Sequence, residues 1–97
     1  MEENDFGPRS FNYWNYEIIK STIEGNDLVL IIQLRFTTGT LKFVDIKDFN
    51  ERKDIISKCI FSIQHKDMDD HYKVYRIEFL DQSNLDIIAK NKVYTEQ

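Results

Sequence analysis

Apolar and polar side chains alternate along most of this chain, which is the pattern of strands that bury one face. The clearest segment is 28–36, in which every even position is apolar. Val29 and Ile31 add apolar side chains at odd positions, so this strand is predicted to be central and covered on both faces. The turn residues Gly25-Asn26-Asp27 precede it and predict a hairpin with a strand over 17–23.

The two strands beside this central one have less regular patterns. In the segment 17–23, Ile19, Ser21 and Ile23 lie on one face, and Ile18 disturbs the alternation. After the central strand, Thr37-Thr38-Gly39-Thr40 is typical of a turn.

A strand over 41–46 is predicted to follow that turn. The apolar parity changes between Phe43 and Val44, as a β-bulge would cause.

The second half of the chain predicts three more strands, over 56–65, 72–80 and 85–94, with turns at 65–70 and 81–84. In the last strand, apolar residues at 85, 87, 89 and 93 share one face against Asp86, Lys90 and Lys92. The stretch 48–63 fits a helix and a strand about equally. We predict a short helical turn near 48–54 before the strand.

These segments predict an all-β fold with about six strands joined by short turns. Such turns leave no room for the helical crossovers that parallel pairs need, so the expected architecture is an antiparallel meander folded into a small sandwich or open barrel. Residues 1–10 are polar and hold the only proline, which predicts a flexible lead-in that could be deleted cheaply. Residues 11–97 form the single domain, since 97 residues suffice for one core.

Charge and composition argue against a nucleic-acid-binding, membrane-spanning or exported protein. The net charge of −4 opposes attraction to phosphates, so nucleic acid is not an expected partner. The longest unbroken apolar run, Leu28–Ile32, is far too short to span a membrane, and no export signal is visible. Cys59 is the only cysteine and is predicted to be a buried, reduced thiol. These features predict a cytoplasmic protein.

One loop collects side chains that can bind a metal. His65, Asp67, Asp69 and His71 lie within seven residues. The favoured interpretation is a solvated hairpin loop, because aspartate is common in turns and Lys66 would oppose a cation. A metal site is the alternative. No motif for a nucleophile, an acid–base pair or a phosphate loop is present, so neither an enzyme nor a cofactor is expected.

Aromatic residues are concentrated near the start, where five lie between positions 6 and 16. The favoured interpretation is that Trp14 and Tyr16 close one end of the core. The alternative is an exposed partner-binding surface formed by Tyr13, Trp14 and Tyr16, because tryptophan and tyrosine are enriched at interfaces.

The order of these features resembles a group of short bacterial all-β proteins that includes immunity proteins of polymorphic toxin systems. The matching stretches are Trp14-Asn15-Tyr16-Glu17, Gly25-Asn26-Asp27-Leu28-Val29-Leu30, Thr40-Leu41-Lys42-Phe43, Tyr75-Arg76-Ile77-Glu78-Phe79 and Leu85-Asp86-Ile87-Ile88-Ala89. Members of that group often carry histidine-aspartate shortly after the first aromatic residue, where this chain has Tyr16-Glu17. No catalytic residues are carried over.

The resemblance implies a binding protein that neutralises a partner protein by occlusion, and an acidic chain suits a basic toxin surface. Two alternatives stay open. One is a small β-barrel that binds a ligand or a metal. The other is a homodimeric structural subunit paired through an exposed strand edge.

Overall fold

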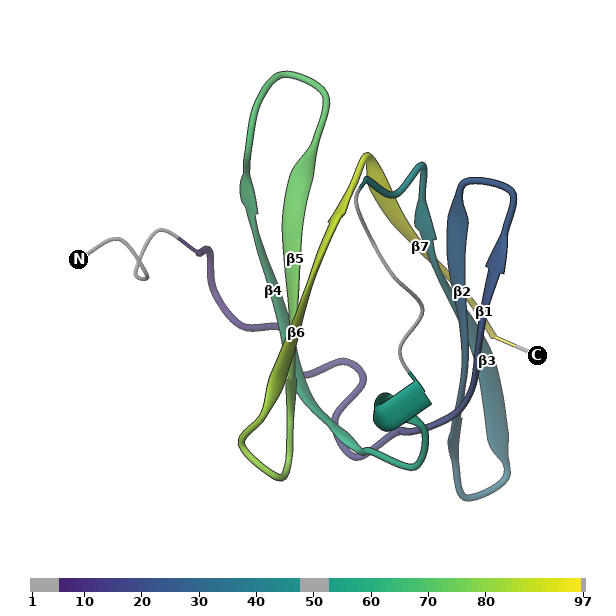
Figure 1. The fold of residues 1–97 in the computed structure, drawn as a ribbon. Coiled ribbons are helices and arrows are strands. Elements are labelled where there is room, and N and C mark those ends of the chain that lie inside the picture. The colour runs from purple at the N-terminus through teal and green to yellow at the C-terminus, as the bar shows by residue number, and fades with distance from the viewer. Residues whose placement is uncertain (1–5, 48–52, 97) are drawn as a thin grey trace.

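The computed structural model describes residues 6–47 and 53–96 and confirms the all-β, antiparallel prediction. Its elements are β1 (Glu17–Glu24), β2 (Asp27–Leu34), β3 (Thr37–Val44), the one-turn 3-10 helix η2 (Lys53–Ile55), β4 (Ile60–Asp67), β5 (Lys73–Phe79), β6 (Asn84–Ala89) and β7 (Asn91–Glu96). The strands form two sheets, ordered β1-β2-β3-β7 and β4-β5-β6, which face each other as an open sandwich (Figure 1). Within the described ranges, no helix is long and apolar enough to span a bilayer.

The core lies between the two sheets. The even positions of β2 from Leu28 to Ile32 are fully buried, and β2 lies between β1 and β3, as the alternation predicts. The opposite sheet contributes Tyr75, whose ring centroid is 5.4 Å from that of Phe43. This contact joins the two layers directly, within a core that is otherwise mainly isoleucine and leucine.

The inner face of β1 differs from the prediction. Ile18 is fully buried and Ser21 is nearly so, whereas Ile19 and Ile23 are well exposed. The register with β2 shifts between Ile18 and Lys20, so Ile19 occupies a bulge. A bulge adds one residue and reverses the parity after it, which explains why Ile18 appears out of pattern in the sequence.

The predicted turn at 37–40 is wrong. The β2–β3 turn consists of Arg35 and Phe36, with Arg35 at a φ of 56°, and Leu34 pairs with Thr37 across it. Residues 37–40 are the first half of β3, where Gly39 leaves space for the ring of Tyr94 on β7. The glycine therefore serves strand packing rather than a turn.

The predicted bulge near Phe43 is also wrong. The pairing of β3 continues without interruption on both sides, with Leu28 opposite Phe43 on β2 and Asn91 opposite Val44 on β7. Phe43 points into the core and Val44 lies on the partly covered outer face. Consecutive apolar residues occur here because the outer face of β3 is partly buried as well as the inner face.

The predicted strand over 85–94 is two strands in different sheets. β6 and β7 meet at Lys90, where the chain bends from one layer into the other (Figure 1). The bend changes the parity of the buried side chains. Leu85 to Ala89 keep the predicted inner face, but Val93 is 43% exposed and Lys92 turns inward.

The stretch 48–63, which the sequence assigns to helix or strand, is described by the structure from residue 53 onward. η2 provides a short helical turn at 53–55, and β4 begins at Ile60 and extends to Asp67, so the strand starts and ends later than predicted. The rest of the predicted helical turn, residues 48–52, lies outside the described residues. Cys59 precedes β4 and is only partly buried, whereas the sequence predicts a buried thiol.

Residues 6–10 pair with the outer edge of β4. The backbone N–H of Gly7 donates to the carbonyl of His65 at 2.9 Å, and Ser10 and Ile63 exchange two backbone hydrogen bonds. The ring of Phe6 faces the Nζ of Lys66 at 4.8 Å and the guanidinium of Arg76 at 4.3 Å. These contacts argue against a cheap deletion of the lead-in, of which residues 1–5 lie outside the described ranges.

Candidate protein-binding surface

Three connections lie at the same end of the sandwich: segment 11–16, the β2–β3 turn and the β5–β6 turn (lower end of Figure 1). Strand pairing fixes this arrangement. Glu17, at the start of β1, pairs with Gln33 near the β2–β3 turn and also with Cys59 just before β4. Ile60, at the start of β4, pairs with Phe79 beside the β5–β6 turn.

Each of these connections leaves a large apolar side chain in solvent. We call these side chains, together with Phe61 at the start of β4, the aromatic end; its members are Phe11, Trp14, Phe36, Phe61 and Leu80. Phe36 at the tip of the β2–β3 turn is 102% exposed, and Trp14 is 52% exposed. Single exposed apolar residues are ordinary, but five at one end of a small domain form a concentration that calls for a function.

The fold of segment 11–16 decides which aromatic residues are exposed. The N–H of Trp14 donates to the carbonyl of Phe11 at 3.0 Å, and the N–H of Tyr16 donates to the carbonyl of Tyr13 at 3.1 Å. Asn15 has a φ of 69°, a left-handed conformation that asparagine tolerates well. These tight turns direct Tyr13 into the core and leave Trp14 outside.

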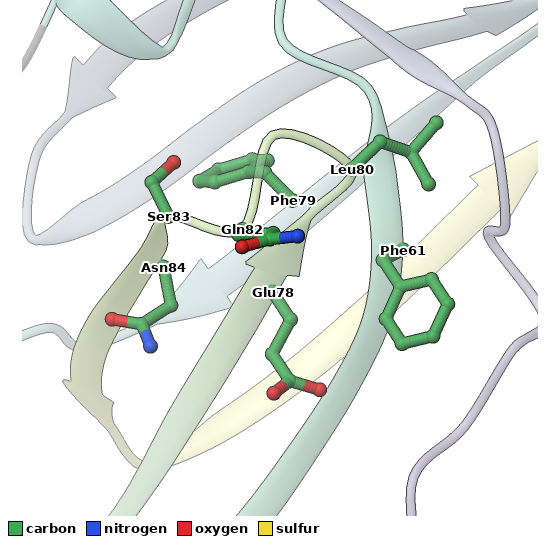
Figure 2. Close-up of a pocket in the computed structure, with 7 residues that line it drawn as sticks. All are labelled: Phe61, Glu78, Phe79, Leu80, Gln82, Ser83 and Asn84. Atoms are coloured by element: carbon green, nitrogen blue, oxygen red, sulfur yellow. The ribbon is translucent and has the colours of Figure 1, made fainter.

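Phe11, Phe61 and Leu80 are linked by a ring contact and a shared hollow. The rings of Phe11 and Phe61 meet edge to face, with centroids 5.3 Å apart. Phe61 and Leu80 both line a shallow hollow of about 390 Å³, together with residues of the β5–β6 turn (Figure 2). Figure 2 shows the Glu78 carboxylate and the amides of Gln82 and Asn84 among the side chains that line this hollow. The apolar surface therefore has polar groups around it.

Two carboxylates of this rim are held by hydrogen bonds and ion pairs. The guanidinium of Arg9 contacts Glu78 at 2.6 Å and is the main cause of a lowered Glu78 pKa. Hydrogen bonds from Ser83, with help from the ammonium of Lys58 at 2.9 Å, lower the pKa of Asp81 to about 2. Both carboxylates are thus ionised at neutral pH. An apolar centre with a charged rim is the usual anatomy of a protein interface.

The three sequence-predicted partner-binding residues divide between core and surface. Tyr13 is buried, with its ring 5.1 Å from that of Tyr94, and Tyr16 is partly buried against the core. Trp14 presents about half of its surface to solvent. Trp14 is therefore the member of this set that is most available to a partner.

Sequence reasoning missed three members of the aromatic end. Phe36 fits the alternation of β2 and so reads as a core residue, although it lies beyond the last paired position. Phe61 occupies the irregular step between Ile60 and Ser62, where the β4–β5 register shifts. Leu80 follows directly after β5, and alternation places it on the face opposite the inward-facing Tyr75, Ile77 and Phe79. For Phe36 and Phe61, no local signal separates the exposed position from a buried one.

The four predicted metal-ligating residues are distributed over β4 and the β4–β5 turn. His65 and Asp67 lie on β4, and the His65 ring is 5.6 Å from the Tyr75 ring. The Asp69 carboxylate accepts backbone hydrogen bonds from His71 at 2.8 Å and Tyr72 at 2.9 Å, which also lower its pKa. In the described part of the chain, no three histidine, cysteine or carboxylate side chains come together as a metal site. Asp69 acts in the structure as a turn residue.

Comparison with protein-family models, with curated proteins and with solved structures finds no match to this chain. The function must therefore be inferred from the residues themselves. An apolar surface with a polar rim can bind another protein, since it offers buried area at its centre and hydrogen-bonding groups at its border.

Proposed function

We propose that this chain is a non-enzymatic, protein-binding module of the immunity type, which neutralises a partner protein by covering its surface. The observation that carries the proposal is the aromatic end: three separate connections at one end of the sandwich each expose a large apolar side chain. Aromatic rings are unfavourably hydrated when exposed, so burying them against a partner gives a favourable free energy of binding.

The aromatic end has the composition of an energetic hot spot. Tryptophan and other aromatic residues contribute most to binding when they lie near the centre of an interface and are surrounded by groups that exclude water. Trp14, Phe11 and Phe61 provide such a centre. Glu78, Arg9 and Asp81 provide the surrounding polar groups.

The overall charge favours a basic partner. With 17 acidic and 13 basic residues the chain carries a net charge of −4, and such a field accelerates encounter with a positively charged surface. A basic toxin is therefore the class of partner that we propose, and the association rate should fall as salt concentration rises.

The test is binding to the protein encoded by the neighbouring gene. We expect a one-to-one complex by light scattering and a dissociation constant measurable by calorimetry. Trp14→Ala and Phe61→Ala should each weaken binding by about tenfold or more, as truncation of a hot-spot residue does. The control is Met68→Ala, since Met68 is 47% exposed in the β4–β5 turn at the opposite end. The affinity of the Met68→Ala variant for the partner should equal that of the wild type.

Light scattering of the chain alone separates this proposal from self-association. We expect a monomer. A dimer that dissociates on Trp14→Ala would reassign the aromatic end to a homodimer interface. Equal losses of affinity in Trp14→Ala and Met68→Ala, or no complex at all with the neighbouring gene product, would contradict the proposal.

A further inference from the structure

A second hollow, of about 320 Å³, lies where β7 faces β4 and β5. Segment 6–10 supplies Ser10 to its wall, β4 supplies His65, and β5 supplies Lys73 and Tyr75. The wall is completed by Asn91 and Lys92 of β7. Residues from both sheets and from the segment beside β4 thus converge on one space, whose volume is at the lower end of the range of roughly 300–1,000 Å³ for small-molecule sites.

The charged side chains that line this hollow are basic, whereas the chain as a whole is acidic. The chain has an excess of acidic residues, yet His65, Lys73 and Lys92 line the hollow and no carboxylate does. Among the described residues, neither Lys73 nor Lys92 forms an ion pair with a carboxylate. On β4, Asp67 pairs with Lys73 in the β4–β5 register, and its charge contributes to the raised pKa of Tyr75.

Lys92 is the central cation of this group. It lies on the inner face of β7 opposite Phe43, with its Nζ 5.0 Å from the centre of the Tyr13 ring. Burial lowers the pKa of Lys92, which means that its charge has lost part of its hydration. The aromatic face compensates in part, but a cation without an anionic partner in such a place remains costly.

We propose that this hollow binds an anionic group of a small molecule, a carboxylate or a phosphate, between the ammonium groups of Lys73 and Lys92. The hydroxyl of Ser10 and the amide of Asn91 are available as further hydrogen-bond donors. Lysine binds phosphate as a point charge, and charge-assisted hydrogen bonds are stronger than neutral ones. The site is independent of the aromatic end, so either assignment can fail without the other.

The test is a titration of the isotope-labelled chain, followed by NMR, with sodium phosphate and separately with sodium succinate, at pH 7 and constant ionic strength. We expect saturable shifts concentrated at the amides of Lys73, Tyr75, Asn91 and Lys92. Lys92→Met and Lys73→Met should each reduce the affinity about tenfold, the cost of losing a hydrogen bond to a charged group. The control Lys20→Met removes the same charge from exposed β1 and should have no effect.

The outcomes are distinct. Saturation by either salt supports the site, and the tighter of the two identifies phosphate or carboxylate as the preferred group. Linear shifts without saturation, or an equal loss of affinity in Lys20→Met, would overturn it. Lys73→Met keeps the test decisive if Lys92→Met unfolds, since Lys73 lies at the start of β5 and is not fully buried.

Discussion

The ring of Tyr94 on β7 lies directly over Gly39 on the adjacent strand β3. A methyl group added at Gly39 would be placed 2.3 Å from the Tyr94 hydroxyl oxygen and 2.4 Å from its Cε1 atom. Glycine within a strand often marks such a close approach. Here it allows an aromatic side chain to cross the strand and complete the inner face beside Tyr13.

Gly39→Ala should destabilise the fold by about 1–3 kcal/mol, the usual cost of overpacking. The measurement is the free energy of unfolding in urea. In a Tyr94→Leu background the same substitution should cost less, because the two positions are in contact. Gly25→Ala is the matched control: it has open space around it but a φ of 63°, so its cost should not depend on Tyr94. An equal cost of Gly39→Ala in both backgrounds would contradict the steric explanation.

Ser21→Ala should stabilise the protein. Ser21 is 8% exposed on β1, and in the described part of the chain its hydroxyl has no hydrogen-bond partner. A buried polar group without a partner costs about 1–3 kcal/mol, so removing the hydroxyl should raise the free energy of unfolding by up to about 1 kcal/mol after the loss of packing. Thermal unfolding checks this. A lower melting temperature would indicate that the hydroxyl is satisfied.

Phe6→Ala should lower the free energy of unfolding by about 1 kcal/mol, because two cations face the ring and each such contact contributes about 0.5–1 kcal/mol at exposed sites. Deletion of residues 1–10 should cost more, since it also removes the backbone hydrogen bonds to β4. Phe6→Leu separates the cation–π contribution from apolar contact, because leucine keeps the apolar contact but has no aromatic face. If the deletion leaves stability unchanged, the lead-in contributes nothing.

Acidification should remove the stabilisation that the Asp81 carboxylate gives to the β5–β6 turn. The pKa of Asp81 is lowered from 3.8 to about 2, so the folded state binds protons less readily than the unfolded state. Its contribution is complete above pH 3.8 and is lost as the pH falls toward about 2. The stability difference between the wild type and Asp81→Asn, measured in urea, should therefore shrink between pH 6 and pH 2. A constant difference would refute this.

Much of the fold follows from period-two burial. The strands β2, β5 and β6 and the hairpin at Gly25-Asn26 are predictable because their apolar positions alternate and their turn residues are unambiguous. Two of the errors occur where the backbone changes parity. The bulge at Ile19 and the bend at Lys90 each reverse which side chains face inward. Ile18, out of pattern, is the one sign of the bulge, and nothing in the neighbouring residues marks the bend.

The candidate surface was less predictable than the fold. Trp14 stands out in the sequence by residue type, but Tyr13, one residue earlier, is equally aromatic and is buried. Their different positions depend on the two tight turns of segment 11–16 and on a hydrogen bond from Asn15 to Ile60. Such long-range contacts lie outside what alternation along the chain can indicate.

The bend at Lys90 also sets an order of assembly. β6 belongs to the three-stranded sheet and β7 to the four-stranded one, so β3 has no partner on one side until residues 91–96 have been synthesised. During translation, the hairpins of the first sheet exist with an open edge that could pair with other nascent chains. Closure of that edge requires β7, so β3 stays open to pairing with other chains until residues 91–96 dock on it.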